Sequence, residues 1–127
     1  MWGCILTYNN IVIHELGMLF ETLCDSNGVD HVELFIEALE DETAEKVLKK
    51  LEAFEQLTFA EHMSAEHIKK IEGKLFEVRI RINADCYRFF GTTRGDTFYM
   101  VHAIKKKADK PKRKDIDLAV RRISNLN

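Results

Sequence analysis

Cysteine is scarce in this chain of 127 residues, where only Cys4, Cys24 and Cys86 occur, an odd number at wide spacing. Three separated cysteines form neither a disulfide framework nor a metal-binding C-x-x-C pair, so a reducing cytoplasm is the expected compartment. The sequence also lacks an apolar run long enough to cross a bilayer, and it lacks the basic segment that begins a secretory signal. We therefore expect no membrane partner.

Proline occurs only once, and no internal repeat, low-complexity tract or domain linker divides the chain. Hydrophobic residues make up 46% of the sequence and charged residues 31%, which is typical of a globular protein. A chain of this length and composition predicts one domain with a real hydrophobic core.

Basic residues are nearly absent from the first half of the sequence. Residues 1–68 contain three Lys or Arg against fourteen Asp or Glu, whereas residues 69–127 contain sixteen Lys or Arg against seven Asp or Glu. The net charge of −2 therefore conceals an acidic half of −11 and a basic half of +9. This asymmetry favours an anionic partner for the second half, although two halves that simply neutralise each other would give the same counts.

Hydrophobic periodicity predicts a small α+β domain over residues 18–127, with residues 1–17 as an extension outside it. The expected elements are a strand over 18–24, helices over 30–39 and 43–54, strands over 75–82, 86–91 and 97–104, and a helix that begins at Pro111 and ends near Ser124. This order, β-α-α-β-β-β-α, predicts an antiparallel sheet with an N-terminal helical hairpin and a C-terminal helix. Ser64 is expected to cap a short turn that ends at Gly73. The extension is either an added strand or the product of an upstream start site.

The stretch LFEVRIRINADCYRFF, residues 75–90, places Glu77, Arg79 and Arg81 on one face of a strand and apolar residues on the other. Arg79 and Arg81 lie about 7 Å apart by strand rise, and Arg88 on the next strand joins them if the register allows. Arginine presents a planar fork that suits phosphate oxygens. A half-exposed strand can also carry arginine for solubility and edge protection, so both interpretations stay open.

His102 is the only histidine of the sheet half, and a lysine run follows it. Its pKa class suits proton transfer near neutral pH, but a lone histidine on a strand is more often structural. The other four histidines lack ligand spacing and are interpreted as surface or capping residues: His14, His31, His62 and His67. No cluster of Asp, Glu and His looks like a metal site, so we expect neither a metal nor another cofactor.

The joint run from Leu75 to Ala119 resembles the RelE/ParE superfamily, most of all the phage-derived, HigB-like branch of bacterial type II toxins. The resemblance rests on L-F-E-V-R-I-R, Y-R-F-F, V-H-A-I-K-K-K and K-P-K-R-K-D-I-D-L-A in this order, and it covers roughly residues 18–124. Two positions depart from the branch, because Lys110 stands where a Thr is common and Ala103 where a Gly is frequent. Neither departure removes a charged group.

The resemblance implies a RelE-like fold and a toxin that cleaves messenger RNA, often on the translating 70S ribosome. It implies a cognate antitoxin, usually a helix-turn-helix protein of the HigA-like kind. Carried over by position, it places Arg79 and Arg88 at the substrate phosphate and His102 at a family histidine. The lysine run that follows His102 is interpreted as placing Lys105 or Lys106 at the cleavage site. The wider RNA contact would use further residues of the basic half: Arg81, Tyr99, Lys107, Lys110, Lys112 and Arg113.

The expected reaction is metal-independent attack of the RNA 2′-hydroxyl on the adjacent phosphate. Fixed cations would stabilise the developing charge, and a positioned acid or base would move a proton. Two alternatives use the same sequence features: a ParE-like poison of gyrase that is not an enzyme, and a basic phage-encoded accessory protein that binds nucleic acid. A fold alone does not decide among these activities.

Overall fold

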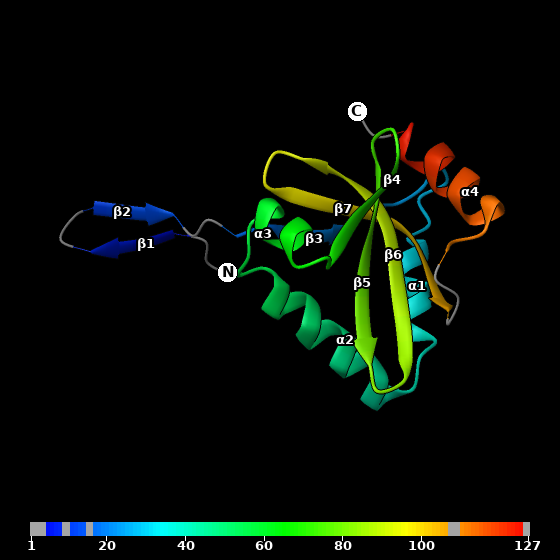
Figure 1. Ribbon diagram of the computed structural model, residues 1–127, viewed down its shortest axis with the longest axis horizontal. Helices are drawn as coiled ribbons and strands as arrows, with labels where there is room; N and C mark the ends of the chain where they lie inside the picture. The colour runs from blue at the N-terminus through cyan, green and yellow to red at the C-terminus, as the bar shows by residue number, and fades with distance from the viewer. Residues whose placement is uncertain (1–4, 9–10, 15–16, 107–109, 126–127) are drawn as a thin grey trace.

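The computed structural model describes residues 5–8, 11–14, 17–106 and 110–125 of the chain, with side chains for residues 17–105 and 110–125. Figure 1 shows a sheet with helices on both sides. The elements are, in chain order, β1 (Ile5–Tyr8), β2 (Ile11–His14), β3 (Leu19–Thr22), α1 (His31–Glu37), α2 (Asp41–Phe54), α3 (Phe59–Ser64), β4 (Ile68–Glu72), β5 (Leu75–Ile82), β6 (Asp85–Arg94), β7 (Thr97–Lys106) and α4 (Arg113–Ile123).

The main sheet has five strands in the order β3-β7-β6-β5-β4. Adjacent strands run antiparallel, except that the edge strand β3 pairs with β7 in parallel. In this pairing Leu19 lies opposite Thr97. The α+β fold is therefore confirmed, but the prediction of a wholly antiparallel sheet was wrong. The reason is that the helices α1 to α3 carry the chain from β3 to β4 at the opposite edge, and the antiparallel strands β4 to β7 then return across the sheet to β3. Strands β1 and β2 form a separate two-stranded hairpin.

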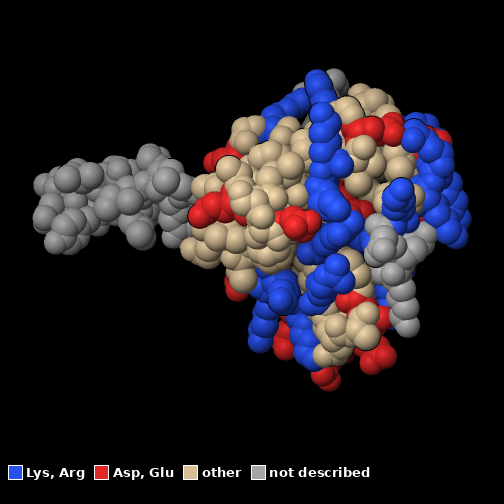
Figure 2. Space-filling model, viewed as in Figure 1, with Lys and Arg blue, Asp and Glu red and all other residues tan. Residues whose placement is uncertain are grey.

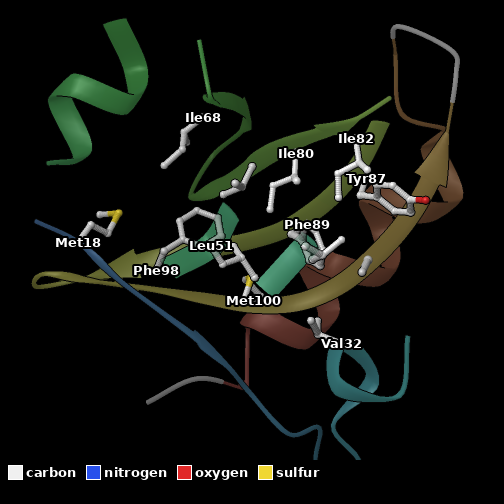
Figure 3. Close-up of a cluster of buried hydrophobic side chains, with 13 residues drawn as sticks. Met18, Val32, Leu51, Ile68, Ile80, Ile82, Tyr87, Phe89, Phe98 and Met100 are labelled. Atoms are coloured by element: carbon white, nitrogen blue, oxygen red, sulfur yellow. The ribbon is translucent and has the colours of Figure 1, made fainter. Parts of the chain in front are cut away.

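One face of the sheet is apolar and is covered by α1 and α2, which pack on β7 and β5. Figure 3 shows side chains from the strands meeting those of the helices, among them Phe89, Ile80 and Leu51. Each large side chain removed from water in this way contributes about 1.5–3 kcal/mol. The opposite face has a smaller apolar cluster under α4, in which Phe90 packs with Ile116. The remainder of that face is polar.

The segment between α2 and β5 differs most from the sequence prediction. Thr58, not Ser64, caps a helix there: it forms a capping box with Glu61, and Ser64 is the last residue of α3. The strand β4 follows, and Gly73 occupies the turn between β4 and β5 with a φ of 53°. The turn needs this left-handed conformation, which glycine adopts at little cost.

Two further expectations also failed. The C-terminal helix begins at Arg113, with Lys112 as its N-cap, so Pro111 precedes the helix instead of opening it. His62 is not a surface residue, since it is fully buried. Its Nε2 donates a hydrogen bond to the Phe54 carbonyl at 2.7 Å, and its Nδ1 lies 3.2 Å from the Nδ1 of His67.

Candidate functional site

A buried carboxylate organises the arginines on the polar face of the sheet. Glu77 of β5 is fully buried, and its Oε1 accepts a hydrogen bond from the Arg79 Nε at 2.7 Å. Its Oε2 accepts from an Arg88 guanidinium nitrogen at 3.2 Å. Arg79 and Arg88 are direct register partners on β5 and β6, so the register brings together the two residues that the sequence proposed. We call Glu77, Arg79 and Arg88 the arginine cluster.

The members of the arginine cluster differ in their access to solvent. The Arg79 side chain is 18% exposed and the Arg88 side chain 4% exposed. Two guanidinium groups around one carboxylate leave a net positive charge at a place where few water molecules screen it. This arrangement suits a solvent-reachable Arg79 that contacts an anion and an Arg88 that fixes the carboxylate beneath it.

Three successive rows of register partners cross β5, β6 and β7 on this face. They are Glu77–Phe90–His102, Arg79–Arg88–Ile104 and Arg81–Cys86–Lys106. His102 is thus one row from Arg79 and two strands from Glu77, which amounts to about 10 Å across the sheet. Arg81 lies one row further along and is exposed. On this face, cationic residues of β5 and β7 therefore lie on either side of the buried residues of β6.

A β-bulge determines which residues of β7 reach this face. Phe90 pairs with His102 and Gly91 with Met100, so Val101 is an extra residue on β7. A Cβ at Gly91 would lie 1.9 Å from the Tyr99 carbonyl oxygen, so the close approach of the two backbones requires glycine. Beyond a bulge the alternation of the strand is reversed. The prediction from the sequence assumed uninterrupted alternation along this strand, so it did not include the reversal.

Contacts from α4 hold His102 on both of its ring nitrogens. Its Nε2 lies 2.9 Å from the Asp115 Oδ1, and its Nδ1 lies 3.4 Å from an Arg122 guanidinium nitrogen. The ring stacks on Phe90 with centroids 5.7 Å apart. Burial lowers the pKa of His102, and the hydrogen bond to Asp115 opposes this shift only in part. Near neutral pH the imidazole is therefore neutral, with Nε2 donating to Asp115 and Nδ1 accepting from Arg122.

The lysines after His102 do not all join the arginine cluster. Lys105 is the register partner of Tyr87, on the apolar face, where its Nζ lies 3.3 Å from an Asp85 carboxylate oxygen and 5.9 Å from the centre of the Tyr87 ring. Lys106 is the register partner of Cys86, in the same row as Arg81. The structure thus separates two residues that the sequence treated as equivalent.

The wider set of proposed RNA contacts is dispersed. Tyr99 pairs with Thr92 on the far side of the row that holds His102. Arg113 forms a bidentate pair with Glu72 at 2.8 and 3.0 Å, which raises the pKa of its guanidinium and ties α4 to β4. Lys110 and Lys112 are both exposed near the start of α4. Lys107 lies outside the described residues.

Sequence reasoning placed Glu77 on the arginine face but gave it no role, and it missed Asp115 and Arg122. The alternation of residues 75–82 was a sufficient signal for Glu77. No local signal pairs Asp115 with His102, because the contact depends on how α4 crosses the sheet. Within the part of the chain that the structure describes, no group of three or more His, Cys, Asp and Glu could hold a metal ion. No described helix is long and apolar enough to span a membrane.

A comparison with protein families matched the region of the chain that contains the arginine cluster. The sequence model of the family described as "Phage derived protein Gp49-like (DUF891)" matches residues 34–124, which is most of the chain. Searches of curated proteins and of solved structures found no match. The matched range contains α2, all of β4 to β7, and α4.

Proposed function

The chain belongs to the phage-derived Gp49-like family, a RelE-like family of toxin–antitoxin systems, and on that premise we propose that it is the toxin of such a system and cleaves messenger RNA. The observation that supports this proposal most is the arginine cluster, in which a fully buried Glu77 fixes two arginines on an otherwise open sheet face. A purely solubilising arginine needs no buried carboxylate beneath it. Guanidinium groups held in a fixed orientation are well suited to a phosphate site.

In the proposed reaction the RNA 2′-hydroxyl attacks the adjacent phosphorus, and the bond to the 5′-oxygen breaks. Arg79 contacts the phosphate oxygens as negative charge develops on them, and Arg88 keeps the carboxylate and Arg79 in place. Removing one such preorganised cation costs about 3–4 kcal/mol of transition-state stabilisation. The upstream fragment ends in a 2′,3′-cyclic phosphate, and the downstream fragment carries a 5′-hydroxyl.

Removal of the 2′-hydroxyl proton is assigned to the Nδ1 of His102, because its Nε2 faces Asp115; the leaving 5′-oxygen takes up a proton from water. The contact of Nδ1 with Arg122 is long, at 3.4 Å, so a substrate hydroxyl could replace it. Asp115 then acts as a positioning residue that fixes the tautomer of the ring. Lys106 stays in the proposal as a source of positive field, whereas Lys105 is excluded because it lies on the other face, beside Asp85.

The proposed partner is a helix-turn-helix antitoxin that silences the toxin by covering groups of the basic half. Charge asymmetry between the halves supports this choice of surface. If charges at the rim of that interface dominate, affinity falls as salt is raised. An interface confined to residues 31–54 would instead indicate that the antitoxin excludes the toxin from the ribosome by bulk.

The experiment that tests the proposed function is induced expression followed by mapping of RNA 5′ ends. Wild-type protein should create new 5′-hydroxyl ends within messages, and Arg79→Ala should not. Lys74→Ala, which changes an exposed lysine in the turn between β4 and β5, is the matched control and should cut like the wild type. Growth arrest without new RNA ends would contradict cleavage and favour a poison of gyrase.

A further inference from the structure

A groove on the surface links the arginine face to α2. It encloses about 490 Å³, and its lining comes from two segments far apart in the sequence: Lys46, Lys49, Lys50 and Ala53 of α2, and Arg81, Ile82 and Asn83 at the end of β5. Four of these seven residues are cationic, and none is acidic. Ala53 and Ile82 contribute small apolar surfaces between the charges.

The three lysines of this groove are the only cations of the acidic half of the chain. They recur at spacings of three and four residues, so they share one side of α2. The neighbouring stripe of the same helix contains the buried Val47 and Leu51, which fix the rotation of α2 against the sheet. The three lysines therefore border the end of β5, and Lys49 also borders a second groove that contains Asp41, Glu45 and Glu52.

Arg81 lies on one face of the sheet and α2 covers the other face. Arg81 can still lie close to the lysines of α2, because the edge of the sheet is open at the end of β5. Strand β4 pairs with β5 only as far as Val78, and the backbone N–H of Arg79 donates to the His67 carbonyl at 2.9 Å. Beyond that point β5 has no partner on its β4 side among the described residues. Figure 2 shows a band of Lys and Arg that runs over the sheet and continues toward the part of the surface formed by α2.

The groove cations are weakly committed to other groups. Lys46 and Lys49 form i,i+4 pairs with Glu42 and Glu45 at 3.2 and 3.8 Å, all on exposed side chains. Such pairs contribute only about 0.2–0.5 kcal/mol. Among the side chains that the structure describes, neither Lys50 nor Arg81 has an ion-pair partner. A multivalent anion could therefore recruit all four without breaking a strong contact.

We propose that this groove binds backbone phosphates of the single-stranded RNA that flanks the cleavage site, so that the strand passes from the arginine cluster over Arg81 to α2. The proposal rests on the proposed function. It is supported by the one-row step from Arg79 to Arg81, about 7 Å along the strand, and by the continuity of positive charge around the open edge. Apolar patches between the cations suit sugar and base surfaces.

The test is a binding titration with a labelled 20-nucleotide RNA whose sugars are all 2′-O-methyl, so that it cannot be cut. The variant carries Lys46→Gln, Lys49→Gln and Lys50→Gln. The matched control carries Lys70→Gln, Lys74→Gln and Lys114→Gln, three exposed lysines on β4, on the turn after it and on α4. Both variants lose the same charge, so a uniform field effect is identical in the two.

If all three groove lysines contact phosphates, the slope of log affinity against log salt falls by about 2, since each single-strand phosphate contributes about 0.7. That slope corresponds to a loss of about a hundredfold at 0.1 M salt relative to 1 M. The control should keep most of the wild-type slope. Equal losses in both variants, or no salt-dependent binding by the wild type, would overturn the proposal.

The two proposals can fail separately. If the wild-type protein never cuts RNA, but the salt slope falls only in the groove variant, the groove proposal holds and the nuclease proposal fails. If the protein cuts RNA, but the groove variant binds the 2′-O-methyl strand like the wild type, the nuclease proposal holds and the groove proposal fails.

Discussion

The two faces of the five-stranded sheet are built from the same strands but bury different chemistry. Toward α1 and α2 the strands bury only apolar groups at their centre, such as Val78, Ile80 and Phe89. Toward α4 the same strands bury Glu77 and Arg88 beside Phe90. A buried ion pair is weak evidence for stability, since apolar residues of similar size often stabilise as well. The polar face is therefore the one whose composition stability alone does not explain.

Breaking the arginine cluster from its centre should have the largest effect on folding. Glu77→Ala leaves the buried Arg88 without its carboxylate, and removing one partner of a buried pair costs about 3–5 kcal/mol. Urea denaturation measures the loss, with Glu45→Ala as the control, because that exposed pair with Lys49 contributes little. A loss below about 1 kcal/mol would mean that Arg88 is well solvated after all.

Truncation on the apolar face should separate stability from activity. Phe89→Ala removes a fully buried ring and should cost about 3–5 kcal/mol of unfolding free energy. At a temperature where the variant is still folded, its cleavage rate should stay within a few-fold of the wild type. A large loss of rate in the folded variant would show that the apolar face also shapes the site.

Arg79→Ala should have the opposite result, with a large loss of cleavage rate and a small loss of stability. Arg88 remains to pair with Glu77, so the loss of stability should be smaller than the loss of about 3–5 kcal/mol expected when a buried charge loses its partner. The cleavage rate should fall by two to three decades. Arg79→Lys should recover only part of the rate, because an ammonium lacks the planar fork. Full activity of a folded Arg79→Ala protein would remove the phosphate interpretation.

Lowering the pH should reduce the stability of the protein through two histidines, one on each side of the sheet. Burial lowers the pKa of His62 and of His102 below the ordinary value of 6.5. The unfolded chain then takes up protons at higher pH than the folded one, so stability is full above about pH 7 and falls as the pH drops through 6.5. Around His62 the charged or titratable neighbours are His67 and Glu61. Melting temperatures from pH 8 to 5 should show a smaller decline in His62→Gln than in the wild type; an equal decline would assign the effect to other groups.

Removal of residues 1–17 should have the smallest effect. Strands β1 and β2 pair only with each other, and Met18 is the first buried residue of the described core. A chain that starts at Met18 should melt within a few degrees of the full chain and cut RNA at a similar rate. A large fall in melting temperature would show that the extension packs on the domain.

The sequence predicted most of the fold because its strongest patterns are local. The alternation of residues 75–82 and the helical spacing of Val47 and Leu51 each identify an element without help from the rest of the chain. Strand β4 was missed because IKKIE lies between two turns and has no clear period. The capping box of Thr58 and Glu61 was legible in the sequence and was overlooked.

The site was less predictable than the fold because it depends on contacts distant in sequence. Arg79 and Arg88 could be paired in advance, since a short hairpin almost fixes their register. The separation of Lys105 from Lys106 follows from the alternation of β7, but which of the two shares the face of the arginine cluster depends on the register of β7 with β6. The positions of Asp115 against His102 and of the α2 lysines beside Arg81 required the packing of two helices on opposite faces.

The measurement that tests the central claim most directly compares two RNA substrates that differ by one atom. Once the cut site is mapped, a substrate with a single 2′-deoxy sugar at that site is set against the all-ribose form under single-turnover conditions. If the arginine cluster holds the phosphate while the 2′-hydroxyl attacks, the deoxy substrate should bind with similar affinity and resist cleavage. Equal rates of cleavage for the two substrates would contradict the account.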